Sequence, residues 1–462
     1  MNIEDLNSLH RRAADLNQRV RDAACRGRHQ RDEILNRRVN RTTLDEYMTA
    51  CHELIFSGFA VETDTRELSL GYAEMPKDKP CPKLKPWVDF IDQQKLTFGK
   101  LYDALGSETR VFENRDVMER LWKGLSPRKP IGDETFFRFF MRDSFEKPVA
   151  HIISELAKIE NVREAFGLED GIEFAEKQDF VIDTSGAAYD GHMPFPCTPG
   201  SYVDRKDEAS SAQLQVVCVV EWKLPHMLTT PRLRAGLREM DVFEEVANRE
   251  SMLPACGDST ARFRYHAEKL TAYALTDAYD QMINEGIEYG LVTTGEATVF
   301  LKVNWDEPGT LYYHLAEFGP KVMAYLSDDP ICTAVGQHLA FILMILGQQS
   351  QHTREERRRA VAGLKTWKAD FVDLWRSIPE SERWVSPENC LEPMTYEGVD
   401  RSPKFPASEE CDDTLVNEDC DETLVNEDCD ETLVNENESP ESSGDESTSW
   451  VDLGDGGDWS FV

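Results

Sequence analysis

A short apolar run in the middle of the chain, Val216–Val220, is the feature that most constrains the fold. Its residues are small and mostly β-branched, so the run predicts a buried strand. The run ends in Glu221-Trp222-Lys223. Because side chains alternate along a strand, Glu221 and Lys223 are predicted to point to the same face.

Two opposite charges at the end of a buried strand allow two interpretations. They form a surface ion pair where the strand reaches solvent, or they belong to a chemical site. Burial of charged groups is costly unless they are paired or bound to a metal. Pro225 ends the strand, because proline cannot donate to a ladder. The short motif alone does not decide between the two interpretations.

The charge of the chain is unevenly distributed. The formal net charge is −35, but residues 405–462 contain 20 Asp or Glu and no Lys or Arg, which leaves −15 for the rest. A moderately acidic body argues against strong non-specific binding of nucleic acid, which normally needs a basic face. The net charge does not exclude a local basic groove.

The cysteines argue against a zinc-binding protein, and the apolar segments argue against a secreted or membrane protein. The 11 cysteines include no C-x-x-C and no Cys/His cluster, so no zinc site is predicted. The first residues lack a signal-peptide pattern, and the longest apolar stretch, 338–346, is too short to cross a membrane. We therefore expect an intracellular protein of the cytoplasm or nucleus, without membrane contact.

Hydrophobic periodicity predicts alternating helices and strands. The order favours an α/β (α+β) fold with a mixed central sheet flanked by helices. The predicted helices cover 43–56, 87–105, 113–124, 135–166, 258–285, 333–346 and 353–376, and the predicted strands cover 180–182, 216–223, 289–293, 298–303 and 311–315.

The same patterns divide the chain into four segments. The first carries ten Arg between Arg11 and Arg41, which indicate either a solvated helix face or a nucleic-acid patch. The segments are a basic helical N-terminal segment (1–41), a mainly helical region (42–140), the α/β core (141–380) and a disordered acidic tail (381–462).

The acidic tail contains a nine-residue repeat in three copies, beginning at Cys411, Cys420 and Cys429. Three such acidic units cannot bury a core, so disorder is predicted. Near the end, Trp450 and Leu453 follow acidic residues with the spacing of short motifs that ubiquitin-like autophagy modifiers bind by strand addition. The tail is therefore predicted to bind a protein partner.

Several longer motifs resemble a group of filamentous-fungal proteins. The resemblance extends from about residue 43 to 347. It is carried by Leu84–Phe90, Glu221–His226, Tyr289–Ala297 with Val299–Leu301, and Leu311–Leu315.

Within that group, Asp179 followed by Glu221-x-Lys223 resembles the D…E-x-K signature of the PD-(D/E)XK nuclease superfamily. The resemblance implies a nuclease-like core over 141–380. It implies that Asp179, Glu221 and Lys223 are catalytic, with Asp179, Glu221 and the backbone carbonyl of Trp222 holding Mg²⁺. Glu155 or Glu160 would complete the set.

The chain departs from the group at two places. The interval from Asp179 to Glu221 is long, so Asp183, Asp190 or Asp204 are alternatives for the first acid. Relatives carry Gln and Tyr where this chain has Asp277 and Gln281. That carboxylate would be a third metal ligand, or it would mark loss of activity.

Two hypotheses follow from these residues. The first is a metal-dependent nuclease whose basic rim comes from Arg232, Arg234, Arg238 and Arg357–Arg359. The second is a catalytically inactive, nuclease-like interaction module with an acidic partner-binding tail.

Overall fold

The computed structural model describes residues 40–54, 58–71, 75–123, 130–168, 171–176, 200–205, 215–249, 253–318, 330–346, 352–384 and 386. The basic segment 1–39, most of the acidic tail and the predicted strand 180–182 lie outside these residues.

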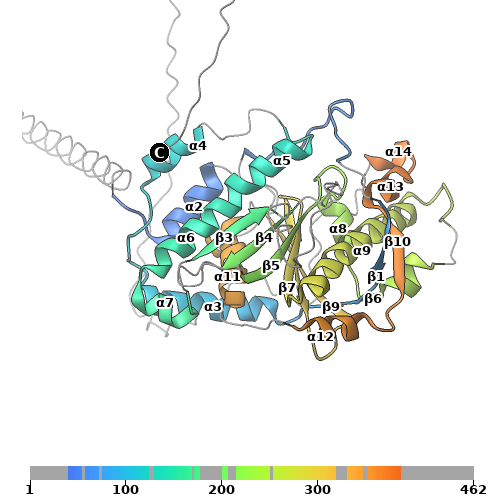
Figure 1. The fold of residues 1–462 in the computed structure, drawn as a ribbon. Helices are drawn as coiled ribbons and strands as arrows, with labels where there is room; N and C mark the ends of the chain where they lie inside the picture. Colours follow the sequence, from blue (N-terminus) through green and yellow to red (C-terminus); the bar gives the residue numbers. More distant parts are fainter. Residues whose placement is uncertain are drawn as a thin grey trace, which may run out of the picture. The chain divides into compact units, whose positions relative to one another are not determined.

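The described residues form an eight-stranded mixed sheet at the centre of the fold (Figure 1). Strands β3 (Ile172–Glu176), β4 (Gly200–Arg205) and β5 (Gln215–Trp222) form an antiparallel meander. Strand β5 is parallel to β7 (Tyr289–Thr293), and β7, β8 (Ala297–Val303) and β9 (Thr310–Glu317) are antiparallel. The predicted mixed central sheet is thus confirmed. In spatial order the strands are β3 (Ile172–Glu176), β4 (Gly200–Arg205), β5 (Gln215–Trp222), β7 (Tyr289–Thr293), β8 (Ala297–Val303), β9 (Thr310–Glu317), β2 (Lys83–Pro86) and β6 (Met240–Asp241).

The parallel pairing of β5 with β7 requires a crossover connection. Helix α9 (Ser259–Glu285) is the longest element of this connection and packs against both strands. Val219 and Glu221 of β5 therefore face α9, as does Gly290 of β7, where a Cβ atom would lie 2.7 Å from Met282 Sδ of α9. Trp222, between Glu221 and Lys223, faces the opposite side of the sheet.

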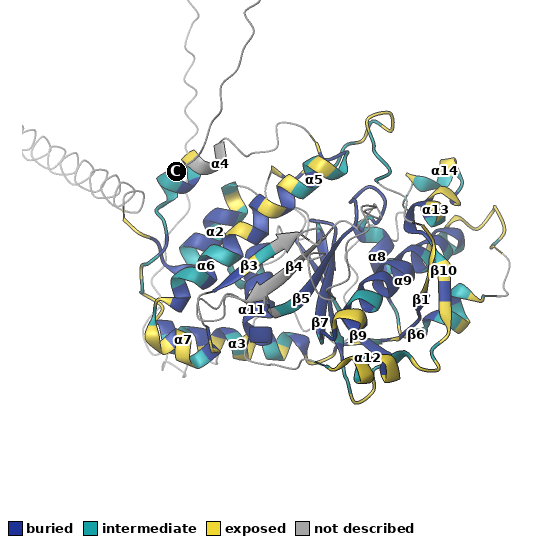
Figure 2. Cartoon of the chain, in the orientation of Figure 1, coloured by how far each residue is buried: buried dark blue, intermediate teal, exposed yellow. Residues whose placement is uncertain are grey.

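Helix α11 (Ala334–Leu346) covers that opposite side. All its residues are buried, as Figure 2 shows by its dark colour, and its range agrees with the helix predicted over 333–346. Phe300 of β8 packs on Phe341, and His338 stacks on Phe145. The two faces of the sheet therefore differ, because polar groups gather on the α9 side.

The region before β3 is mainly helical. The predicted helix 135–166 consists of several shorter helices, because a π-helical segment follows α5 and extended Ile159 precedes α7. The elements are α2 (Leu44–Leu54), α3 (Phe90–Leu105), α4 (Arg115–Lys123), α5 (Glu134–Met141), η2 (Arg142–Glu146), α6 (Lys147–Ala157) and α7 (Glu160–Phe166). Strand β2 also comes from this region, so the division at 140 stays a prediction.

The predicted single helix over 353–376 is wrong. Helix α12 (Arg354–Val361) is followed by Gly363, whose φ of 90° does not continue a helix. Strand β10 (Thr366–Ala369) then pairs antiparallel with β1 (Lys77–Pro80) in a separate two-stranded sheet. The Asp370 side chain accepts a hydrogen bond from Asp373 N and begins α13 (Phe371–Arg376).

Short elements complete the fold: α8 (Thr230–Gly236), η4 (Phe243–Ala247), η5 (Pro330–Cys332) and α14 (Glu380–Arg383). Helix α8 packs along α9. None of the described helices is long and apolar enough to cross a membrane.

Replacement of Gly236 by Ala tests the close approach of α8 to α9. A Cβ atom there would lie 2.5 Å from Ala267 O and collide with Thr271. We expect Gly236→Ala to lower the free energy of unfolding by about 1–3 kcal/mol. Gly99 is the matched control, because it is exposed in α3 with nothing near its added Cβ. Gly99→Ala should gain roughly 0.5–1 kcal/mol in urea unfolding. Equal effects at both sites would contradict close packing at Gly236.

Three buried histidines predict acid sensitivity. Burial lowers the pKa of His226, His266 and His338 to about 4, against about 6.5 in an unfolded chain. Their contribution to stability is therefore present above about pH 6.5 and lost as pH falls towards 4, because only the unfolded chain takes up protons there. Each histidine should contribute about 1.4 kcal/mol per pH unit within this window.

Urea unfolding across this pH range measures the slope. His226 Nε2 donates to Ser69 O at 2.8 Å, a bond that a glutamine amide can imitate. The slope of the free energy of unfolding against pH should be shallower in His226→Gln, by about the contribution of one histidine. An unchanged slope would show that His226 is not held neutral in the folded state.

Candidate functional site

The end of β5 and the middle of α9 bring polar side chains together on one face of the sheet. Glu221 and Lys223 project from β5 towards α9. Asp277 and Gln281, four residues apart and therefore on the same helix face, project towards them. The predicted common orientation of Glu221 and Lys223 is confirmed by their direct contact.

Lys223 is the hub of these contacts. Its Nζ donates to Glu221 Oε1 at 3.0 Å and to Asp277 Oδ2 at 2.9 Å. Gln281 Nε2 donates to the other oxygen of Glu221, Oε2, at 3.0 Å. Both Glu221 oxygens therefore have defined donors, one from the strand and one from the helix.

A second lysine enters from a distant part of the sequence. Lys79 of β1 donates its Nζ to Asp277 Oδ1 at 2.5 Å. Each ammonium also lies near an aromatic ring: Lys79 is 5.2 Å from the centroid of Tyr273, and Lys223 is 5.0 Å from that of Phe371. We name Lys79, Glu221, Lys223 and Asp277 the four-charge cluster.

The four-charge cluster is buried and balanced. Glu221 is fully buried, and the other three residues are at most 6% exposed. Two ammonium groups face two carboxylates, so their formal charges cancel. Burial would raise the pKa of Asp277, but the attraction of Lys223 and Lys79 outweighs it and holds this pKa well below its usual range.

Two neighbouring groups on α9 add to the polarity of the site. Gln281 Oε1 is buried and has no hydrogen-bond partner within the described ranges. Asp280 is partly buried and lies beside the cluster. Burial raises its pKa to about 6, so it is mostly ionised above neutral pH.

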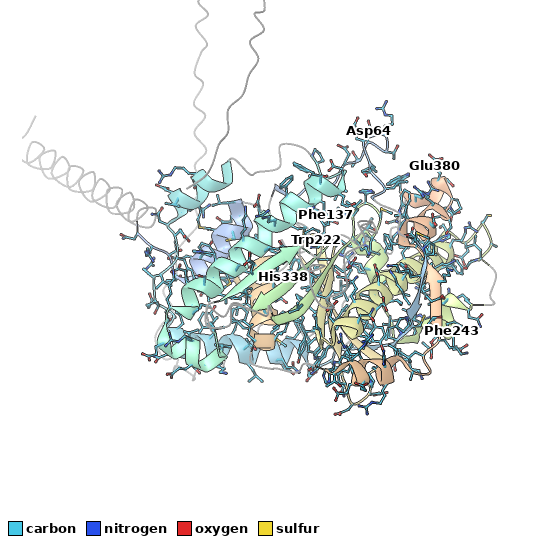
Figure 3. All side chains as sticks on the ribbon, in the orientation of Figure 1. Asp64, Phe137, Trp222, Phe243, His338 and Glu380 are labelled. Atoms are coloured by element: carbon cyan, nitrogen blue, oxygen red, sulfur yellow. The ribbon has the colours of Figure 1, made fainter. Side chains whose placement is uncertain are left out.

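A small cavity of about 50 Å³ reaches the cluster. Lys223 and Asp277 line it together with Trp222, Phe137 and Phe371. Figure 3 labels Phe137 and Trp222 at this end of β5. Glu134 and Asp370 line the cavity as well, so one ammonium and three carboxylates share it with apolar side chains. Charged groups beside apolar walls interact more strongly than they do in water.

The predicted first acid cannot be placed. Asp179, Asp183 and Asp190 lie outside the described residues. Asp204 lies on β4, but it pairs with Val216 of β5, whereas the residue of β4 that pairs with Glu221 is Gly200. On the helices upstream, Glu155 pairs with Lys158 at 2.5 Å and exposed Glu160 with Arg163, so neither joins the cluster.

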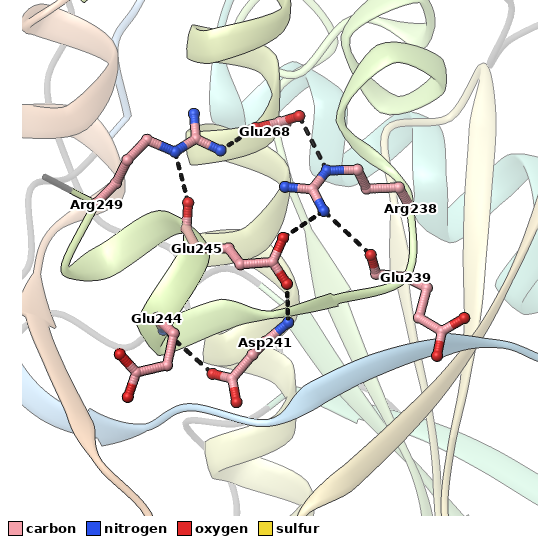
Figure 4. Close-up of polar contacts among 7 residues, drawn as sticks. All are labelled: Arg238, Glu239, Asp241, Glu244, Glu245, Arg249 and Glu268. Atoms are coloured by element: carbon pink, nitrogen blue, oxygen red, sulfur yellow. Dashed lines mark hydrogen bonds and ion pairs between the residues drawn. The ribbon is translucent and has the colours of Figure 1, made fainter. Parts of the chain in front are cut away.

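The predicted basic rim is largely wrong. Arg232 is buried and donates to the carbonyls of Met227 and Arg383, and Arg234 forms a buried ion pair with Glu317. Arg238 lies between Glu245 and Glu268 in the network of Figure 4. Arg232 and Arg234 of α8, and Arg238 just after it, are therefore engaged in contacts within the fold.

On helix α12, two of the arginines predicted for the basic rim are exposed. Arg358 and Arg359 are exposed on it, and Arg357 donates to Asn284 O, one turn beyond Gln281 on α9. The exposed arginines therefore lie on the helix that borders the C-terminal end of α9.

Lys79 carries no local signal in the sequence, because β1 is a four-residue strand in a turn-rich stretch. Its role depends on a contact 198 residues away. Asp277 and Gln281 were recognised as departures from relatives. In the structure Asp277 contacts Lys223 and Gln281 contacts Glu221, the two charged residues of the E-x-K motif.

Comparison with known proteins points to a fungal relative. Residues 205–368 match the family model described as the Spore killer 2 N-terminal domain. The chain is also similar to the meiotic driver SPOK2 of Podospora anserina, with 24% identity over 362 residues, which cover 72% of this chain and 46% of that protein. The matched part therefore spans about half the length of that relative. No solved structure matches the chain.

The matched range contains Glu221, Lys223, Asp277 and Gln281, whereas Lys79 lies outside it. The expected similarity to fungal proteins is thus confirmed at the level of this relative. The nuclease-like core stays a prediction.

Removal of Lys79 tests whether the cluster stabilises the fold. Lys79→Met leaves the buried Asp277 carboxylate with one ammonium instead of two. We expect a loss of roughly 3 kcal/mol or more in the free energy of unfolding. Lys158→Met, which breaks an exposed pair with Glu155, should cost less than about 1 kcal/mol. Similar losses of unfolding free energy in both variants would show that the buried ion pair stabilises the fold no more than the exposed one.

Proposed function

We propose that the four-charge cluster with Gln281 is a site of metal-dependent phosphodiester hydrolysis. The observation that carries this proposal is the convergence of Glu221 and Lys223 from one strand with Asp277 and Gln281 from the crossover helix, next to a cavity. A carboxylate and a lysine held two residues apart at a strand end are the groups that such chemistry needs.

The donor chemistry fits a hard divalent cation. Glu221 supplies a buried carboxylate, and Gln281 Oε1 is a buried amide oxygen with no hydrogen-bond partner among the described residues. Amide and carboxylate oxygens suit Mg²⁺. Glu221, Gln281, the carbonyl of Trp222 and an acid such as Asp179 would hold it. Within the described ranges, no three His, Cys, Asp or Glu side chains form a metal-binding group.

When bound, the cation would lower the pKa of a water molecule and offset negative charge on the phosphate. The chain's own residues contribute orientation and charge. Gln281 fixes one oxygen of Glu221, and Lys223 holds the other. Lys223, which lines the cavity, donates to a phosphate oxygen as charge develops there. The apolar side chains in the cavity lining strengthen that contact.

A second candidate is the catalytically inactive, nuclease-like interaction module. The cancelled charges of the cluster favour it, because both Asp277 oxygens are already occupied by lysines. In this case the cluster would serve the fold alone. Binding would then depend on the acidic tail with Trp450 and Leu453, which lies outside the described residues.

The similarity to a protein named a meiotic driver suggests the biological process. We extend that process to this chain: it would act in spore killing, and the cluster would supply the hydrolytic step. Expression of the chain in a fungal host, with and without Glu221→Gln, tests the connection. Equal growth or spore viability in the two strains would separate the cluster from that process.

Glu221→Gln and Lys223→Met test hydrolysis directly. Each should lower cleavage of DNA or RNA in the presence of Mg²⁺ or Mn²⁺ by roughly 100-fold or more, because each removes a charge at the reacting group. A nuclease assay on the full chain, with chelator as blank, measures the effect. Glu155→Gln is the matched control and should retain activity, since Glu155 pairs with Lys158 away from the cluster. A wild-type chain that neither binds the cations nor cuts nucleic acid would favour the inactive module.

A further inference from the structure

Asp277 has an unusual position between two lysines that come from different sheets. Its Oδ1 accepts from Lys79 of the β1–β10 sheet at 2.5 Å, and its Oδ2 accepts from Lys223 at the end of β5 at 2.9 Å. One small anion thus bridges two ammonium groups through two oxygens. The two non-bridging oxygens of a phosphodiester can bridge two lysines in the same way.

We propose that Lys79 and Lys223 form a two-lysine clamp for a nucleic-acid phosphate, and that the Asp277 carboxylate occupies the place of that phosphate in the closed site. The inference rests on the proposed function and names the group that the site recognises. It adds Lys79 as a substrate-contacting residue and makes Asp277 an internal competitor.

The surroundings of the lysines support a clamp. Tyr273 and Phe371 lie beside the two ammonium groups, and Tyr273 is fixed because its hydroxyl donates to Ala369 O at 2.7 Å. The cavity reaches Lys223 and Asp277 directly, with Glu134 and Asp370 also in its lining, and its volume of about 50 Å³ is on the scale of a single small anionic group. Lys79 does not line the cavity and adjoins it through Asp277. A purely structural ion-pair network would not need such an opening beside its central anion.

The charge balance gives the clamp a measurable signature. With Asp277 ionised, the cluster has no net charge and little attraction for an anion. Neutral Asn at 277 would leave one excess positive charge between Lys79 and Lys223. Glu221 is unaffected, because Gln281 still donates to its Oε2. Binding of a phosphodiester should therefore become tighter when Asp277 loses its charge, and the gain should require Lys79.

Fluorescence anisotropy with a short labelled oligonucleotide, in chelator and above neutral pH, tests this on the full chain. We expect Asp277→Asn to bind about tenfold more tightly than wild type, equivalent to about 1.4 kcal/mol. The double variant Lys79→Met/Asp277→Asn should return to the wild-type affinity. Asp280→Asn is the matched control: it removes the same charge from the same helix, but Asp280 acts on Lys79 through its electrostatic field and does not bridge the two lysines. It should change affinity less than twofold.

Inorganic phosphate is the second probe. Competition by phosphate in Asp277→Asn shows that the lysines recognise the phosphoryl group. Binding of phosphate without any binding of the oligonucleotide would overturn the assignment to nucleic acid. Equal affinities for Asp277→Asn and Asp280→Asn, or weaker binding by Asp277→Asn, would overturn the clamp.

A third comparison applies if Asp277→Asn does not fold. Lys79→Met should bind the oligonucleotide several-fold more weakly than wild type, whereas Lys77→Met, an exposed lysine on the same strand, should not. Equal binding by the two would contradict the clamp. Because binding is measured without divalent cations, a chain that binds as expected but never cuts would refute hydrolysis and keep the clamp.

Discussion

The bridging of Asp277 by two lysines is the interaction on which the polar side of the fold depends. It joins the end of β5, the middle of α9 and the β1–β10 sheet at a single carboxylate. Each of these elements lies far from the others in sequence. Because all four charges are buried, no partner can leave without exposing another to an apolar environment. The cluster therefore fixes the position of α9 across the parallel strands and defines the site at the same time.

The two faces of the sheet have different roles: one packs the apolar core against α11, and the other carries the polar site beside α9. Alternation along β5 sends Trp222 to the side of α11, where aromatic residues and His338 form an apolar layer. The same alternation sends Glu221 and Lys223 to the side of α9. One strand thus contributes both to the core and to the site, and the change of character occurs within three residues.

The sequence predicted those parts that depend on local periodicity. Strands β5, β7, β8 and β9, helices α9 and α11, and the shared face of Glu221 and Lys223 all follow from short patterns. Contacts of long range were not predictable: Lys79 carries no local signal, and the pairing of β10 with β1 converts part of an expected helix into a strand. The arginines of α8 were misassigned because a sequence shows their charge but not their buried partners.

The β1–β10 ladder connects residues 77–80 with residues 366–369. Strand β2, which pairs with β9 and β6, likewise comes from the region before the family match at 205–368. A fragment cut to that match would expose the open edge of β9 and lose one of the lysines on Asp277. The cooperative folding unit is therefore larger than the segment that homology delimits. Evolutionary exchange of this module between proteins would have to carry its N-terminal strands along.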